Sequence, residues 1–193
     1  MKEIVIYDAN IFIDVIDMGI LEALSKADYV IHTTSLVTSE IVEPEQRTAI
    51  AKWLKVMVYR YDTLEQYMDL YAFKSSIQPQ KNLSDPDFSI LKLAIDKSAP
   101  LYTSDASLRK VARIHGVQVH GSVGLVLELN RSRLLTREEA CEAIERLQKA
   151  NTRISQSVID EVLANLELEI GPEATCRNFR HVQNFNFLHP HRM

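Results

Sequence analysis

The stretch that decides the fold is IVIYDANIFID, at residues 4–14. Its first four residues are apolar and mostly β-branched, as in the buried strands of a parallel sheet. Asp8 follows directly, and apolar residues then recur with helical spacing, which predicts a helix over residues 11–24 with Gly19 as its weak point. A buried strand that passes through one aspartate into a helix indicates the start of an α/β fold.

The same alternation continues along the chain to about residue 130. Further strands are expected at residues 29–32, 56–59, 100–103 and 117–119. Further helices are expected at residues 35–43, 46–54, 63–73, 85–97, 107–115 and 122–130. Asp85 is expected to cap the fourth of these helices, with Pro86 at its first position. Strands that alternate with helices in this way predict one α/β domain.

Beyond residue 130 only helical periodicity remains. The capping-box sequence Thr136-Arg137-Glu138-Glu139 predicts a helix at residues 140–149, and another helix is expected at residues 155–168. Gly171 and Pro172 end the helical pattern. We therefore expect an α/β domain over residues 1–130, a helical extension packed on it over residues 131–170, and a basic tail over residues 171–193.

Length and composition exclude several classes of protein. The chain has 193 residues, of which 46% are hydrophobic and 25% charged, which is enough for a sizeable core and argues against disorder. No apolar run approaches the roughly 18 to 20 residues that span a bilayer, and the N-terminus lacks the pattern of a signal peptide. The two cysteines, Cys141 and Cys176, do not have metal-ligand spacing. We expect a cytoplasmic protein, and exclude a membrane protein, a secreted disulfide scaffold and a fibre.

The net charge of −4 is unevenly distributed along the chain. Residues 174–193 contain no acid and carry Arg177, Arg180 and Arg192, which leaves −7 on the rest of the chain. An acidic body does not by itself indicate nucleic-acid binding, because attraction to phosphates needs local positive charge. Carboxylates can also be gathered to hold cations, so charge alone does not decide the function.

Four acids are expected at one end of the sheet. Asp8 follows the first strand and Asp105 comes two residues after the strand at 100–103, and ligands bind at the carboxyl ends of strands in parallel α/β sheets. Glu40 and Asp87 lie on the apolar faces of their helices, with no lysine or arginine in the matching position. Because an unpaired buried carboxylate is costly, a metal cation would satisfy all four.

Each acid also has a purely structural alternative. Asp8 and Asp105 could be helix N-caps, Glu40 a surface residue, and Asp87 a first-turn acid that favours the helix dipole. The alternatives stay open for each residue alone, but all four would have to hold together to remove the site. Asp14 and Asp17, further along the first helix, are expected on its solvated face.

The segments around these acids resemble those of the PIN-domain nucleases. The similar segments are YDANIFID at residues 7–14, TSLVTSEI at 34–41, DFSILKLA at 87–94 and LYTSDASLR at 101–109. The resemblance covers residues 4–129, and its four motifs come in the family's order. Segments at 109–112, 116–117, 121–125, 135–140 and 153–155 are further similar to a prokaryotic subfamily that includes VapC-type toxins. The tail after Gly171 has no counterpart in that likeness.

The resemblance implies a fold and a chemistry. The implied fold is three-layer α/β/α with a central, mostly parallel sheet and C-terminal helices, and the implied activity is metal-dependent cleavage of RNA. Asp8, Glu40, Asp87 and Asp105 would be the catalytic residues and would bind one or two Mg²⁺ or Mn²⁺ ions, which prefer oxygen ligands. Supporting roles are expected for Asn10, Thr103 and Ser104, and contacts with substrate phosphates for Arg109, Lys110 and Arg113. An ordinary helix-start hydrogen bond for Asn10 and a solvated face for the three basic residues remain alternatives.

The same resemblance implies partners. We expect RNA, an antitoxin protein and a second copy of the chain as partners, and no membrane. The competing hypothesis is a non-catalytic PIN module that binds RNA or a protein, and the presence of all four acids argues against it. A doubly wound phosphatase is disfavoured, because the haloacid-dehalogenase type has a second aspartate where this chain has Asn10.

Overall fold

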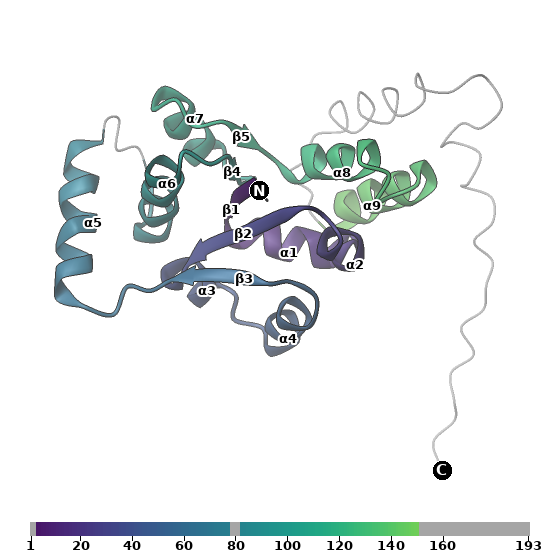
Figure 1. The fold of residues 1–193 in the computed structure, drawn as a ribbon, viewed down its shortest axis with the longest axis horizontal. Helices are drawn as coiled ribbons and strands as arrows, with labels where there is room; N and C mark the ends of the chain where they lie inside the picture. Colours follow the sequence, from purple (N-terminus) through teal and green to yellow (C-terminus); the bar gives the residue numbers. More distant parts are fainter. Residues whose placement is uncertain (1–2, 78–81, 151–193) are drawn as a thin grey trace, which may run out of the picture.

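A single parallel sheet organises the protein. The computed structural model describes residues 3–77 and 82–150, so the helix expected at 155–168 and the tail at 171–193 lie outside the described residues. Five strands lie in the order β3-β2-β1-β4-β5, and every neighbouring pair is parallel. The strands are β1 (Glu3–Tyr7), β2 (Tyr29–Thr34), β3 (Val56–Tyr59), β4 (Leu101–Tyr102) and β5 (Val119–His120). The expected α/β fold with a mostly parallel sheet is confirmed (Figure 1).

Helices cover both faces of the sheet. They are α1 (Ala9–Asp17), α2 (Leu21–Ser25), α3 (Ser35–Glu40), α4 (Pro44–Trp53), α5 (Leu64–Ser76), α6 (Asp85–Lys97), α7 (Ala106–Ile114), α8 (Ser122–Arg131) and α9 (Arg137–Ala150). On one face α6 packs against β1, β2 and β4, with α5 and α7 beside it. On the other face α1 contacts α8 and α9 (Figure 1). The three-layer α/β/α architecture is therefore confirmed.

The order of the strands reverses at β1. The chain runs outward from β1 to β2 and β3, and then returns to β4 on the other side of β1. Ile6 of β1 pairs with Leu101 of β4, and Tyr7 pairs with Tyr102. The carboxyl ends of β1 and β4 therefore lie side by side at the topological switch point, where ligands bind in sheets of this type.

The central strands are buried from both sides. Val5, Ile6 and Tyr7 have no exposed area, which explains why the first strand reads as a continuous apolar run. Helix α9 packs against α1 and α8, and its Ile144 and Leu147 belong to the same core. The part of the helical extension that the structure describes is thus continuous with the α/β domain.

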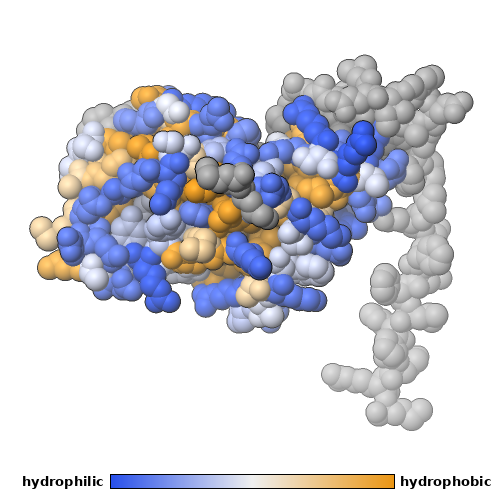
Figure 2. All heavy atoms as spheres, in the orientation of Figure 1, coloured by the Kyte–Doolittle hydropathy of each residue, from blue (hydrophilic) through white to orange (hydrophobic). Residues whose placement is uncertain are grey.

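Large apolar side chains are exposed on several elements of the molecule. Met57 on the edge strand β3, and Leu64, Met68 and Tyr71 on α5, are each more than half exposed. Figure 2 shows apolar residues at the left of the view, over α5, and also in the middle of this face, in both places among hydrophilic ones. In the part of the chain that the structure describes, no helix is both long enough and apolar enough to cross a membrane.

Several helix ends differ from those expected by a few residues, and two differences have a clear local reason. The first expected helix is split into α1 and α2, because Gly19 adopts a left-handed conformation with φ of +73°. Ser84, and not Asp85, caps α6: its hydroxyl accepts a hydrogen bond from Asp87 N, and the Asp87 carboxylate accepts one from Ser84 N. Asp85 instead pairs with Lys74 at 2.8 Å. The assignment of Asp85 as the cap was wrong.

Candidate metal and catalytic site

Asp8 lies at the centre of the switch point and is almost completely buried. It follows β1, caps α1, and is 4% exposed. Its Oδ1 accepts a hydrogen bond from Ala9 N at 2.7 Å. Its Oδ2 accepts one from Asn10 Nδ2 at 2.8 Å and one from Thr103 Oγ1 at 2.6 Å. The side chain is therefore fixed by three donors from two segments of the chain.

Burial dominates the electrostatics of Asp8. Loss of hydration raises the pKa of this carboxyl to about 6, and the negative charge of Asp87 adds to the rise. The hydrogen bonds from Thr103, Ala9 and Asn10 oppose the rise because they stabilise the ionised form. A carboxylate with such a pKa is kept charged at neutral pH at a cost to the folded state, as in sites that bind cations or protons.

Asp105 and Asp8 are connected through one threonine. Asp105 caps α7, where its Oδ1 accepts a hydrogen bond from Leu108 N at 2.6 Å. Its backbone N donates to Thr103 Oγ1 at 3.1 Å, and the same hydroxyl donates to Asp8. Asp8 and Asp105 are thus both helix N-caps, which is the structural role that the sequence analysis gave as the alternative to a metal site. Capping does not remove them from the site, since Asp105 Oδ2 accepts no hydrogen bond from the described residues.

Glu40 and Asp87 approach the same region from α3 and α6. Partial desolvation raises the pKa of Glu40, and the charges of Asp8 and Asp87 raise it further. Burial likewise raises the pKa of Asp87; its hydrogen bonds with Ser84 oppose this, and the charge of Asp105 adds to it. These mutual influences connect the four acids into one electrostatic cluster.

The cluster has the donor chemistry for a hard divalent cation, but its members stand apart. Among residues 3–77 and 82–150, no Lys, Arg or His forms an ion pair with any of the four acids. Within the same residues, no three acidic, His or Cys side chains form a group that could hold a metal ion as placed. Asp87 Oδ2 is turned toward Ser84, at 2.7 Å from its N and 2.8 Å from its Oγ. Joint coordination therefore requires the carboxylates to move closer together, against the mutual repulsion of their like charges.

Two hydroxyl residues connect the helices that carry Glu40 and Asp87. Thr34 caps α3, and its Oγ1 lies 2.7 Å from Ser89 Oγ on α6. Both side chains are fully buried, so the contact is a fixed point between the two helices. The sequence analysis did not single out this pair. Each hydroxyl lies in one of the four segments that resemble the PIN-domain nucleases, at residues 34–41 and 87–94. Nothing in the sequence indicates that the two hydroxyls are in contact.

Asp14 was expected on a solvated face, and that expectation was wrong. It is 4% exposed, and its Oδ2 accepts hydrogen bonds from Ser122 Oγ and, at 3.0 Å, from Ser104 Oγ. The sequence did carry a signal: Ile11 and Met18, three residues before and four after it, are apolar and buried. Asp17 on the same helix is exposed, as expected.

The expected supporting residues lie between β1 and β4. Asn10 donates to Asp8, and its Oδ1 accepts a hydrogen bond from Ser104 N at 3.0 Å. Thr103 contacts both Asp8 and Asp105. The Ser104 hydroxyl bonds to Asp14 and does not contact Asp105. These side chains hold the turn after β4 against the start of α1.

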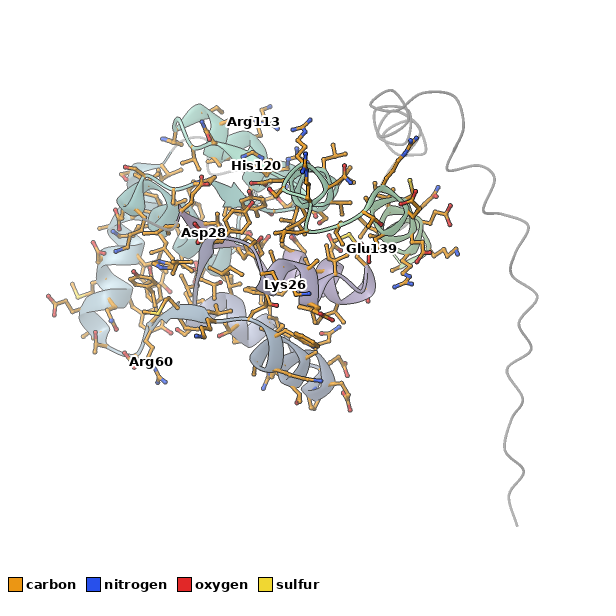
Figure 3. All side chains as sticks on the ribbon, turned by 45° about the vertical axis from the view of Figure 1, so that its right-hand side comes forward. Lys26, Asp28, Arg60, Arg113, His120 and Glu139 are labelled. Atoms are coloured by element: carbon orange, nitrogen blue, oxygen red, sulfur yellow. The ribbon has the colours of Figure 1, made fainter. Side chains whose placement is uncertain are left out.

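Three basic residues follow Asp105 on α7. Arg109 is half-buried, and a Cβ added at Gly121 would lie 3.4 Å from its Nη1. Desolvation lowers the pKa of Arg109, with a smaller contribution from Arg113. Its Nε is enclosed and has no hydrogen-bond partner among the described residues. Lys110 and Arg113 are exposed, and Figure 3 shows Arg113 on the outer surface of α7.

Comparison with known proteins identifies the class to which this fold and site belong. A family model described as a PIN domain matches residues 4–168, and the chain belongs to the PIN-domain family. PIN domains are generally nucleases and usually bind divalent metal ions, so this chain has a nuclease-type fold.

Among solved structures, the chain is similar to a PilT N-terminus domain protein from the hyperthermophilic archaeon Sulfolobus solfataricus P2. The sequence identity is 18%, the TM-score is 0.46, and the match covers 69% of this chain and 94% of the other. No curated protein matches the chain.

Proposed function

We propose that this protein is a metal-dependent ribonuclease that hydrolyses phosphodiester bonds in RNA. The observation that carries the proposal is the cluster of Asp8, Glu40, Asp87 and Asp105 beside the switch point, coupled to one another and without ion pairs to described basic residues. Membership of the PIN-domain family supports the nuclease class. Mg²⁺ or Mn²⁺ is the cofactor that such an all-oxygen set favours.

The four acids are the residues that would hold the metal. A bound divalent ion would supply a water of lowered pKa and stabilise negative charge on the phosphate. Asp8 contributes a carboxylate whose orientation is fixed by Asn10 and Thr103. Glu40 is exposed and Asp105 has one oxygen without a described donor, so both can reorient toward a ligand at small cost.

Basic residues on α7 would bring the substrate to this acidic site. Arg109, Lys110 and Arg113 lie one to two turns beyond Asp105, within the reach of phosphates on either side of the scissile bond. Arg109 is the strongest of the three, because its half-buried guanidinium has lost part of its hydration and gains more from a charged partner. The preference for RNA over DNA rests on the family resemblance alone.

A toxin role in a toxin–antitoxin pair is part of the same proposal. It is supported by the likeness of residues 109–140 to VapC-type toxins, and it carries an antitoxin protein and a second copy of the chain as expected partners. Induced expression in bacteria should then arrest growth for the wild type and not for Asp8→Asn. Normal growth with active enzyme would remove the toxin role and leave the ribonuclease.

A non-catalytic PIN module that binds RNA or a protein is the second candidate function. It is favoured by one observation: among the described residues, no three metal-ligating side chains are close enough to share a metal ion as placed. A module of this kind binds RNA without cutting it, and its affinity does not depend on divalent metal. The two candidates therefore differ in a single assay.

The deciding experiment is cleavage of labelled single-stranded RNA and tRNA with Mg²⁺ or Mn²⁺, and with EDTA. The proteins compared are the wild type, Asp8→Asn, Asp105→Asn and the control Asp17→Asn. Asp17 is exposed at the end of α1, the helix that Asp8 caps. Cleavage by the wild type and the control, lost in EDTA and in both other variants, supports the ribonuclease. Intact RNA in every sample, with RNA binding retained, would favour the binding module.

A further inference from the structure

We propose that Asp14 is a positioning residue, which holds the turn carrying Asp105 and the first turn of α8 against α1. The inference rests on the proposed function and extends it to a residue outside the four acids. Asp14 would contact neither the metal nor the RNA. It would act through Ser104 and Ser122, and so fix the distance between Asp105 and Asp8.

The contacts of Asp14 join three parts of the chain that are far apart in sequence. Its Oδ2 accepts hydrogen bonds from Ser104, in the turn between β4 and α7, and from Ser122, at the first position of α8. The two serine hydroxyls also lie 3.0 Å from each other. Through hydrogen bonds to one carboxylate oxygen, the turn after β4 and the start of α8 are both connected to the middle of α1.

Packing alone does not explain the presence of an acid at position 14. Its side chain is 4% exposed, and no Lys, Arg or His of the described residues pairs with it. Its helical neighbours Ile11 and Met18 are apolar and buried, so an apolar residue would suit this position for packing alone. Burial of a carboxylate without a basic partner is costly even when it is hydrogen-bonded, so an acid at this position indicates that its hydrogen bonds have a role that an apolar residue could not fill. Here those bonds fix the turn that carries Asp105.

Asp14 is the outermost of three successive attachments between α1 and this turn. Asp8 accepts from Thr103, Asn10 accepts from Ser104 N, and Asp14 accepts from Ser104 Oγ. Ser104 is therefore held at both its backbone and its side chain, directly before Asp105. Without the outer attachment, the turn would keep its hydrogen bonds to Asp8 and Asn10 but gain freedom at the residue that precedes Asp105.

The test compares Asp14→Asn, Asp14→Leu and the exposed control Asp17→Asn in the full chain. Three quantities are measured: the melting temperature, the Kd for Mn²⁺ by isothermal titration calorimetry, and kcat and KM for a labelled RNA. Asp14→Leu should weaken Mn²⁺ binding about tenfold or more, the scale seen when partners of metal ligands are removed. It should lower kcat with little change in KM, since no contact with RNA is lost. Asp14→Asn keeps one acceptor oxygen and should be intermediate.

A merely structural role would change the melting temperature without changing the Kd for Mn²⁺ at a temperature where the variant is folded. That result would overturn the inference, as would wild-type Kd and kcat in Asp14→Leu. If both Asp14 variants fail to fold, Ser104→Ala and Ser122→Ala remove the same bonds from the other side and should weaken Mn²⁺ binding in the same direction; unchanged binding in both would overturn it too. Wild-type protein that binds no Mn²⁺ would overturn the proposed function itself.

Discussion

Replacement of Asp8 by Asn should stabilise the metal-free protein at neutral and alkaline pH. Burial raises the pKa of the Asp8 carboxyl from 3.8 to about 6, so the folded state keeps a poorly hydrated charge above pH 6 that the unfolded chain hydrates freely. Asparagine has the same shape and no charge. The substitution therefore removes a cost that the site imposes on the fold.

The size of the effect follows from the shift. A rise of roughly two pKa units corresponds to about 3 kcal/mol of destabilisation once the carboxyl is ionised in both states. Asparagine can keep its Oδ1 toward Asn10 Nδ2 and Thr103 Oγ1, but its N–H₂ group then faces the donor Ala9 N, and the conflict with that one donor costs about 1 kcal/mol. The net gain for Asp8→Asn at pH 8 should be about 2 kcal/mol, or roughly 4 to 8 °C in melting temperature for a chain of this length.

The pH dependence carries the more specific prediction. A carboxyl whose pKa is raised by folding destabilises the protein above the folded pKa, and this penalty is released as the pH falls from about 6 toward the unfolded value of 3.8. The advantage of Asp8→Asn over the wild type should therefore shrink by about 2 kcal/mol between pH 8 and pH 4.5. Urea unfolding followed by far-UV circular dichroism in EDTA, with Asp62→Asn as the exposed control, measures the difference at each pH.

A stability difference between wild type and Asp8→Asn that stays constant from pH 8 to pH 4.5 would refute this reasoning. So would a variant that is less stable than the wild type at pH 8 by several kcal/mol. In that case the hydrogen bonds of Asp8 would outweigh its desolvation, and the site would not be strained in the absence of metal.

Three further predictions test the site, the core and the proposed contact with RNA. Thr103→Val removes the hydroxyl that donates to Asp8 and accepts from Asp105 N, so we expect a loss of about 1 to 3 kcal/mol in urea unfolding at pH 7; no loss would mean that the hydroxyl is not needed there. Leu91→Ala, at a fully buried position of α6, should cost about 2 to 5 kcal/mol in the same assay, and a cost below 1 kcal/mol would contradict the packing. Arg109→Ala should weaken RNA binding and lower the slope of log Kd against log salt by about one, measured by fluorescence anisotropy, whereas an unchanged slope would exclude a phosphate contact.

The sequence predicted the fold well because its signals are local. The β-branched run of β1 and the helical spacing of apolar residues after Asp8 each lie within about ten residues of sequence. Both patterns arise because β1 is buried in the sheet and α1 packs its apolar side on the core. Asp8 and Asp105 were predicted at one end of the sheet because the ends of parallel strands meet at one edge, and Glu40 and Asp87 were predicted to face it from the apolar sides of their helices. The choice between Ser84 and Asp85 as the cap of α6 was missed because both residue types cap helices well.

The parts of the site that could not be predicted depend on contacts between distant residues. Ser122 lies 108 residues from Asp14, and Ser89 lies 55 residues from Thr34, and no pattern within one segment reveals either pair. The prediction of a solvated Asp14 was wrong because aspartates usually lie at the surface, whereas this one lies between the buried Ile11 and Met18. The spacing between the carboxylates depends on side-chain conformations and on the balance of local hydrogen bonds against mutual repulsion, which the sequence does not express.

The most direct test of the central claim is anomalous diffraction from crystals of the wild-type protein soaked in Mn²⁺. The claim is that Asp8, Glu40, Asp87 and Asp105 together bind a divalent cation at the carboxyl ends of β1 and β4. It predicts an anomalous peak bonded to Asp8 and to at least two of the other three carboxylates, and no peak there in Asp8→Asn crystals. A peak elsewhere, or no peak at a Mn²⁺ concentration that supports RNA cleavage, would contradict it.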